Sequence, residues 1–514
     1  MCADGDYVAL MALIPSFGPY TRSQRIMITV PVLMASLLHS INMSTAYVAL
    51  PSIQGNLSAT PDQIGWIITA FVVATAIGTI LTGWLSQRFG RRAVFMGSIV
   101  GFTLTSLLCA SAVDLQQLVL FRMLQGFVSA PLLPVSQSIM LDTYPKEKHG
   151  FAMSIWSMGM IMGPVIGPTV GAVVTEYYGW RYLFLINIPL GVAAFLAIWP
   201  TLPKSPHKPG GLDWVGVIAL ILAVASFQLM LDRGEREGWF DSLEIVIEAF
   251  VAVLAMYVFV VHSMTAKQPY INLAIFQDRN YVIGCCLIFV FGIAVFSSLF
   301  VLPLFLQNIQ GYPVISAGWV VSARGLGTMA AMMSGGFLAD RFQSRHLILA
   351  GLVCVGVSNW MMTGWSASVG LDEIIWITLI NGFGMGVMWV TLSTVTFSTL
   401  PSELRVEGAS LFSLIRAIGA SVGTSVIVMI LVRSTQINYS ELRNHVHPGN
   451  EALSALADTA PLSLESASGI AALAKMVAQE ALMIGFLNDF VFLVGIAIVG
   501  IPLVFLLRKP VRTR

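Results

Sequence analysis

Fourteen long apolar runs constrain this chain of 514 residues more than any other feature of its sequence. A helix that crosses a bilayer needs about 20 apolar residues in succession, with few charges among them. A transmembrane barrel would instead show alternating segments of about 10 residues, and no such segments are visible. The pattern predicts an all-α membrane protein with 14 transmembrane helices near residues 27–50, 63–85, 93–112, 116–141, 151–174, 181–201, 213–231, 243–264, 281–306, 314–339, 346–366, 373–400, 408–432 and 483–507.

The composition excludes several classes of protein. Only 10% of the residues are charged, against about 25% in an average soluble domain, so a soluble multidomain enzyme and a disordered chain are both excluded. The net charge of +1 provides no basic surface for nucleic acid. The five cysteines show no metal-ligand spacing, so we expect neither a metal site nor a disulfide framework.

Basic residues are divided unevenly between alternate connecting segments. With a cytoplasmic N-terminus, 18 of the 27 Lys and Arg residues fall on the cytoplasmic side, six on the opposite side and three inside spans. This is the excess that the positive-inside rule predicts. We therefore expect both termini in the cytoplasm, as tails over 1–25 and 508–514. The charge order in the first tail is wrong for a cleavable signal peptide.

Two short polar segments, 202–212 and 265–280, suggest how the spans are grouped. A third polar segment, 433–482, is predicted to be a long external loop, either a solvated connector or a docking surface for a partner. The predicted domains are an N-terminal bundle over 26–201, two extra transmembrane helices over 213–264 and a C-terminal bundle over 281–507.

A short string recurs at matching positions 253 residues apart. It follows the second span at 83–92 and the tenth span at 336–342. Its glycine permits a tight turn and a close helix approach, and its basic residues favour the cytoplasmic side. The recurrence indicates an internal duplication. The candidate residues of the two loops are Gly83, Arg88, Gly90, Arg91, Gly336, Asp340 and Arg341.

These loops resemble the signature G-x-L-A-D-R-x-G-R-R of the major facilitator superfamily, in which the loop acts as a cytoplasmic latch. Gln87 replaces the aspartate in the first copy, which implies a weaker charged contact there. Arg122, Gln125 and Gly126 resemble the family's R-x-x-Q-G element. A glycine ladder in the fifth span resembles its antiporter motif, at Gly159, Gly163, Pro164, Gly167, Pro168 and Gly171.

The string WRYLFLINIPLG at 180–191 is similar to the signature of the fourteen-span drug:proton antiporters, the EmrB/QacA type. The resemblance covers 25–432 and implies a major facilitator fold, with two six-helix bundles and two additional central helices. In the fifth span, glycines at four-residue steps allow close packing and prolines kink the helix. Such a helix can flex between two packings.

Ionisable residues inside spans are the candidates for proton coupling. Arg122 is expected to face a cavity or a partner, and the resemblance implies a role in proton handling; an arginine that ties helices together is the alternative. The first span resembles L-D-x-T-I-x-N-V-A-L-P, whose aspartate the family uses for the proton, but Asn42 stands there. His39, one turn away, could take over the proton or be a satisfied core histidine. Glu248 in the eighth span is a weaker candidate.

The substrate site has no motif of its own. Arg324 and Arg416 lie within the tenth and thirteenth spans and suit an anionic or amphipathic substrate, or pairing with acids elsewhere. With Gln125 they are the candidates for lining a substrate cavity.

The leading interpretation is a proton-motive-force-driven multidrug efflux transporter that exports lipophilic compounds by alternating access across the cell inner membrane. No ATP-binding loop and no catalytic constellation are visible, so we expect neither an enzyme nor a cofactor beyond the proton gradient. The alternatives are an exporter of an endogenous amphipathic metabolite such as a fatty acid, and a non-transporting sensor or assembly subunit. Expected partners are lipophilic substrates and membrane lipid, without nucleic acid. The resemblance adds a periplasmic adaptor protein and an outer-membrane channel.

Overall fold

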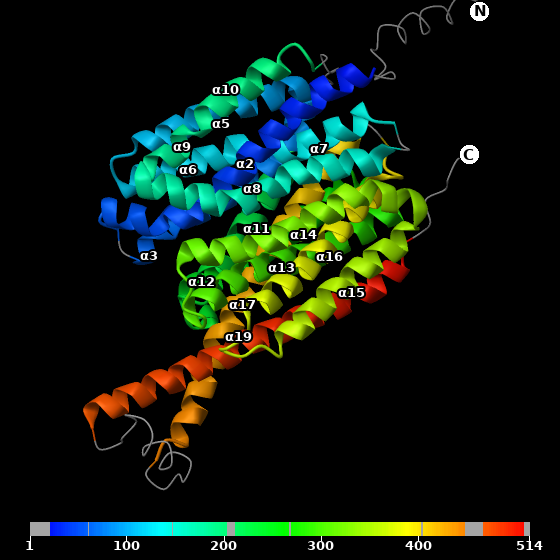
Figure 1. Cartoon of the computed structure of the whole chain (residues 1–514). Helices are drawn as coiled ribbons and strands as arrows, with labels where there is room; N and C mark the ends of the chain where they lie inside the picture. Colours follow the sequence, from blue (N-terminus) through cyan, green and yellow to red (C-terminus); the bar gives the residue numbers. More distant parts are fainter. Residues whose placement is uncertain are drawn as a thin grey trace, which may run out of the picture.

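The computed structural model describes residues 21–59, 61–145, 148–202, 211–266, 269–401, 404–447 and 466–507. The described residues form helices and connecting turns, without a strand among them (Figure 1). The long helices are α2 (Arg22–Asn56), α4 (Trp66–Phe89), α5 (Arg91–Ser111), α8 (His149–Tyr177), α11 (Trp214–Arg233), α12 (Leu243–Thr265), α13 (Arg279–Asn308), α14 (Val314–Arg341), α15 (Ser344–Met362), α16 (Leu371–Phe397), α17 (Arg405–Asn444) and α19 (Ala467–Phe505). The shorter helices are α3 (Pro61–Ile64), α6 (Leu115–Ser129), α7 (Leu132–Thr143), α9 (Arg181–Leu185) and α10 (Asn187–Ile198).

Helices occupy all of the predicted spans. Twelve segments within the described ranges are long and apolar enough to cross a membrane, and each overlaps one predicted span. The remaining two predicted spans, 151–174 and 314–339, coincide with α8 and α14. The all-α membrane fold is therefore confirmed. The total of fourteen crossings and the cytoplasmic placement of both termini stay predictions.

Two of the predicted spans are each divided into two helices, and prolines explain where. The fourth span consists of α6 and α7, and Pro134 lacks the N–H that would donate to the Ala130 carbonyl. The sixth span consists of α9 and α10, and Pro189 likewise cannot donate to Leu185. Each break therefore lies about one turn before a proline.

The predicted external loop 433–482 is partly helical. Helix α17 continues to Asn444 and α19 begins at Ala467, and both project beyond the body of the protein (Figure 1). The Ser466 side chain caps α19 by accepting from Gly469 N at 3.0 Å, and the alanines that follow favour helix. Helix therefore extends further into this segment than expected, and residues 448–465 lie outside the described ranges.

The helices pack in two groups, one before residue 200 and one after residue 278. The groups meet where α8 contacts α14 and α16, and where α17 contacts α4 and α7. Helices α11 and α12 pack on each other, and α11 touches both α4 and α17. The extra pair therefore lies beside the seam between the two groups (Figure 1).

Candidate functional site

Arg122 of α6 is fully buried and binds two other helices. Its Nη1 donates to Asn42 Oδ1 of α2 at 2.6 Å and to Gln125 Oε1 at 2.8 Å. Its Nε donates to the Ile67 carbonyl of α4 at 3.4 Å, and Cζ lies 4.2 Å from the centre of the Phe71 ring. Because a buried charge is costly without partners, this network explains how the guanidinium is held. A carboxylate at the position of Asn42 would form an ion pair with Arg122.

The network continues through Gln125 to α5. Gln125 is fully buried, and its Nε2 donates to Ser106 Oγ at 2.7 Å. Gln125 therefore orients Arg122, and both sides of its amide are already engaged inside the first helix group. That Gln125 lines a substrate cavity stays a prediction.

His39 lies beside this network. Its ring is buried and lies 5.9 Å from the Phe71 ring. Its Nδ1 has no hydrogen-bond partner among the described residues. Arg122 and Arg416 both lie near enough for their charges to act on the His39 ring. The structure thus brings together four predicted residues of the first helix group, namely His39, Asn42, Arg122 and Gln125. Arg416 of α17 lies near them.

The two other intramembrane arginines lack carboxylate partners in the described part of the chain. Arg416 lies half-buried with Cζ 5.9 Å from the rings of Phe296 and Trp389, and no ion pair or hydrogen bond to a described residue holds it. Arg324 is buried, and its Nη1 donates to Ser298 Oγ of α13 at 3.0 Å. Arg324 is therefore tied to a neighbouring helix, whereas Arg416 retains its donors.

Glu248 belongs to a different cluster. Its Oε1 lies 3.6 Å from Arg233 Nη1, and the same guanidinium pairs with Glu244. This cluster joins α11 to α12. Glu248 therefore has a basic partner outside the group formed by His39, Asn42, Arg122 and Gln125.

The glycine ladder of α8 faces α2. A Cβ at Gly163 would lie 2.4 Å from Ser40 Cβ and 2.5 Å from the Ser40 carbonyl carbon, and a Cβ at Gly167 would lie 2.6 Å from Ser44 Cβ. Gly159 and Gly171 face Leu33 and Thr45 in the same way. The side chains of Pro164 and Pro168 lie outside the described residues. Only glycine permits this close approach of α8 to α2.

Gly163→Ala is expected to destabilise the protein, because the new methyl group would overlap the α2 backbone. Overpacking of this kind costs about 1–3 kcal/mol, so the midpoint of thermal unfolding in detergent should fall. Gly97→Ala is the matched control, because a Cβ at Gly97 meets nothing within 4 Å. Equal unfolding midpoints for the two variants would contradict the importance of this contact.

The first signature loop lies against the second helix group. A Cβ at Gly83 would lie 3.5 Å from the Glu407 Cα of α17. Gly90 has φ 83°, in the left-handed region that favours glycine. Arg88 is exposed, with Cζ 5.3 Å from the Trp84 ring, and Arg91 forms an ion pair with Asp142 of α7. In the second copy, Gly336 lies within α14, and the side chains of Asp340 and Arg341 lie outside the described residues.

Asp142 joins the two helix groups, a role that our sequence reasoning missed. Besides Arg91, it accepts from Arg405 Nη1 of α17 at 2.6 Å. The side chains of Asp142 and Arg405 are only 9% and 10% exposed, so water screens this pair weakly. The available signal was that both residues stand at predicted cytoplasmic span ends, but they are 263 residues apart in the chain.

Aromatic side chains close the same part of the seam. The Trp156 ring of α8 stacks on the Trp389 ring of α16, with centroids 6.2 Å apart and an interplanar angle of 17°. Trp389 Nε1 donates across the seam to Ser157 Oγ at 2.6 Å. The two helix groups are therefore in contact between Arg416 and the Asp142 ion pairs.

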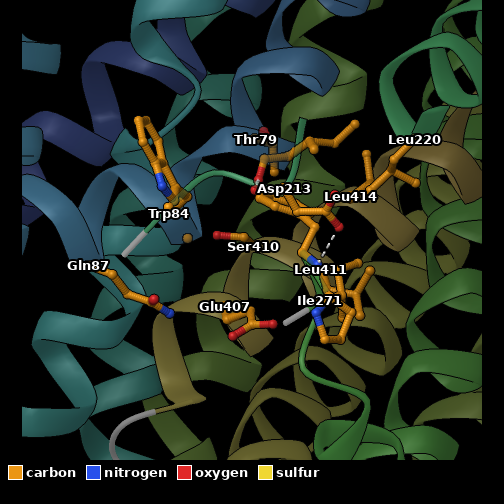
Figure 2. Close-up of a pocket in the computed structure, with 15 residues that line it drawn as sticks. Thr79, Trp84, Gln87, Asp213, Leu220, Ile271, Glu407, Ser410, Leu411 and Leu414 are labelled. Carbon is orange, nitrogen blue, oxygen red and sulfur yellow. Dashed lines mark hydrogen bonds between the residues drawn. The ribbon is translucent and has the colours of Figure 1, made fainter. Parts of the chain in front are cut away.

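A cavity of about 190 Å³ lies where α4, α11 and α17 meet, and Figure 2 shows Asp213 and Glu407 among its lining residues. Asp213 accepts from Gly216 N at 3.0 Å, from His262 Nε2 at 2.8 Å and from Tyr270 N at 3.0 Å. Burial opposes ionisation of Asp213, but these hydrogen bonds hold its pKa below the usual range. The carboxylate thus fastens the segment that connects the helix groups.

Comparison with known proteins agrees with this geometry. Residues 32–424 match the Major Facilitator Superfamily. The chain is 31% identical to multidrug export protein EmrB of Escherichia coli (strain K12) over 498 residues, which cover 96% of this chain and 97% of EmrB. It is 30% identical to fatty acid resistance protein FarB of Neisseria gonorrhoeae over 493 residues, which cover 94% and 96%.

Among solved structures, the proton:xylose symporter XylE matches with a TM-score of 0.61 at 15% identity, over 82% of this chain and 91% of XylE. At this identity the likeness concerns the fold. Together with the full-length likeness to EmrB, it establishes the protein class. The chain belongs to the major facilitator superfamily, as a multi-pass integral membrane transporter of the EmrB type.

Proposed function

We propose that this protein exports lipophilic compounds, driven by inward movement of protons, through alternating access. The observation that carries the proposal is the closed seam: Asp142 binds Arg91 in one helix group and Arg405 in the other. Such a pair can break and reform as two rigid groups rock against each other. The likeness to EmrB, a multidrug export protein, supports the substrate class.

The proposed moving parts are the bundles 26–201 and 281–507, with the extra helices of 213–264 beside the seam. The predicted topology places the Asp142 end on the cytoplasmic side, so the structure would represent a state closed toward the cytoplasm. The helical projections of α17 and α19 would then reach the external side, where they support contact with a periplasmic adaptor protein.

For proton coupling we propose Arg122 and His39. Asn42 cannot titrate, whereas His39 has a ring nitrogen without a hydrogen-bond partner in the described structure. A proton gained or lost there would act on the two nearby guanidinium groups of Arg122 and Arg416. Because Arg122 binds α2, α4 and α6, and Arg416 lies on α17, charge changes at this point would act across the seam.

The direct test is dye efflux from proteoliposomes that hold the purified protein, with and without an imposed pH gradient. Efflux that accelerates with the gradient supports proton-driven export. Efflux that is indifferent to the gradient contradicts proton coupling. The absence of movement for every lipophilic dye would favour a narrow endogenous substrate or a non-transporting role.

A second candidate function is export of an amphipathic anion such as a fatty acid. Arg416 favours it, because this cation lies near two aromatic rings and has no carboxylate partner among the described residues. The likeness to fatty acid resistance protein FarB agrees with it. Two aromatic rings beside one positive charge suit an apolar tail and an anionic head.

Arg416→Gln is expected to weaken transport of a fluorescent fatty acid while leaving a neutral lipophilic dye less affected. Loss of a hydrogen bond to a charged group corresponds to a rise of about tenfold or more in KM for the anion. Arg433→Gln is the matched control, because Arg433 is exposed on the same helix. An unchanged KM for the fatty acid in Arg416→Gln would exclude Arg416 from anion binding.

A further inference from the structure

Asp489 of α19 is a buried carboxylic acid that the transport scheme above does not use. Its side chain is fully buried, and neither carboxylate oxygen has a hydrogen-bond partner among the described residues. No ion pair with a described residue compensates for it. Burying an isolated carboxylate inside a membrane span costs free energy, so a functional role explains Asp489 better than packing does.

The surroundings of Asp489 are apolar. Its chain neighbour Phe490 lies 5.5 Å from the Trp365 ring and 6.3 Å from the Phe305 ring, measured between centroids. Phe486 and Leu493, each within about one turn, are also fully buried. Helix α19 packs against α13, α15 and α17, so the acid points into the core of the second helix group.

Charged groups on the packed helices do not reach Asp489. When these helices are followed away from the level of Asp489, the titratable or charged side chains met first are Cys286 on α13, Cys354 on α15, and Arg416 and Arg433 on α17. None of these acts electrostatically on Asp489, and burial is the dominant influence on its carboxyl group. The acid therefore has no fixed counter-ion in the described structure.

Polar side chains lie at the contact between α17 and α19 close to the level of Asp489. At Gly485, one turn away, a Cβ would lie only 2.7 Å from Thr435 Oγ1 of α17. This hydroxyl oxygen is buried and has no hydrogen-bond partner in the part of the chain that the structure describes. Next to it, Asn488 Nδ2 donates to Ser434 Oγ at 2.6 Å at an exposed position of the same contact.

We propose that Asp489 is a proton-binding site of the transport cycle, loaded along the contact between α17 and α19. The proposal rests on the proton-driven export proposed above. One proton from the predicted external side converts the carboxylate to the neutral acid, which the apolar core accommodates. In the opposite conformation water reaches the acid, and the proton leaves to the cytoplasmic side. Charge and proton number thus balance over one cycle.

The test combines a variant with a chemical probe. Asp489→Asn is expected to lose gradient-driven dye efflux but to keep exchange of dye between the two sides without a gradient, since exchange needs no net proton movement. Asp372→Asn is the matched control, because it removes an exposed carboxylate in the first turn of α16 and should behave as wild type. Gradient-driven efflux at the wild-type rate in Asp489→Asn would overturn the proposal.

The probe is dicyclohexylcarbodiimide, which modifies protonated carboxyl groups in apolar surroundings. We expect peptide mass spectrometry of the wild-type protein to find Asp489 modified, with labelling that decreases as the pH rises. No labelling, or labelling independent of pH, would overturn the proposal even if Asp489→Asn fails to fold. If the wild-type protein shows no gradient-driven efflux while Asp489 labels as expected, the proposed function fails and the protonatable site stands.

Discussion

Arg122→Ala is expected to abolish gradient-driven efflux. The substitution removes the donor that Asn42 Oδ1 and Gln125 Oε1 share in a fully buried site. It also leaves the Ile67 carbonyl without this partner. Each buried acceptor left unsatisfied costs about 1–3 kcal/mol, so the packing of α2, α4 and α6 around this point should loosen. The measurement is dye efflux from proteoliposomes under an imposed pH gradient.

A purely structural role for Arg122 predicts a different pattern from a coupling role. In a coupling role, Arg122→Ala loses gradient-driven efflux but still exchanges dye without a gradient. In a structural role, both activities and the thermal unfolding midpoint fall together. Arg433→Ala serves as the control, since Arg433 is exposed on α17. Full gradient-driven efflux by Arg122→Ala would remove this residue from both roles.

Asp142→Asn is expected to open the seam at the predicted cytoplasmic end. Asp142 neutralises two guanidinium groups, and without its charge Arg91 and Arg405 would face each other while largely buried. Breaking a buried pair by removing one partner costs about 3–5 kcal/mol. That energy suffices to shift a two-state equilibrium strongly toward the conformation in which the groups are apart.

The opening can be measured at Ser157, which accepts from Trp389 across the seam. With the five native cysteines replaced, Ser157→Cys should react slowly with a polar thiol reagent, and faster when Asp142→Asn is added. Arg433→Gln is the control, because Arg433 is exposed on the same helix as Arg405. Equal reaction rates with and without Asp142→Asn would show that the ion pairs do not hold the seam closed.

The sequence alone determined the helical elements and several local contacts of this protein. Apolar runs of sufficient length must form helices in a bilayer, because no water is present there to satisfy the backbone. Glycines at four-residue steps, as at Gly163 and Gly167, must share one helix face, and they do meet α2. An arginine inside a span such as Arg122 must find buried partners. All of these conclusions depend on neighbouring residues in the chain.

The tertiary structure alone decided which distant residues meet. Asp142 and Arg405 pair across 263 positions, and no local pattern ranks that pairing above others. Asp489 is isolated because the three helices packed against α19 offer it no hydrogen-bond donor in the described structure. Hydropathy also could not show that α17 and α19 continue beyond the predicted spans as helix, since polar residues with good helix propensity resemble a loop. Membrane insertion is encoded locally, whereas polar pairing depends on how the inserted helices pack.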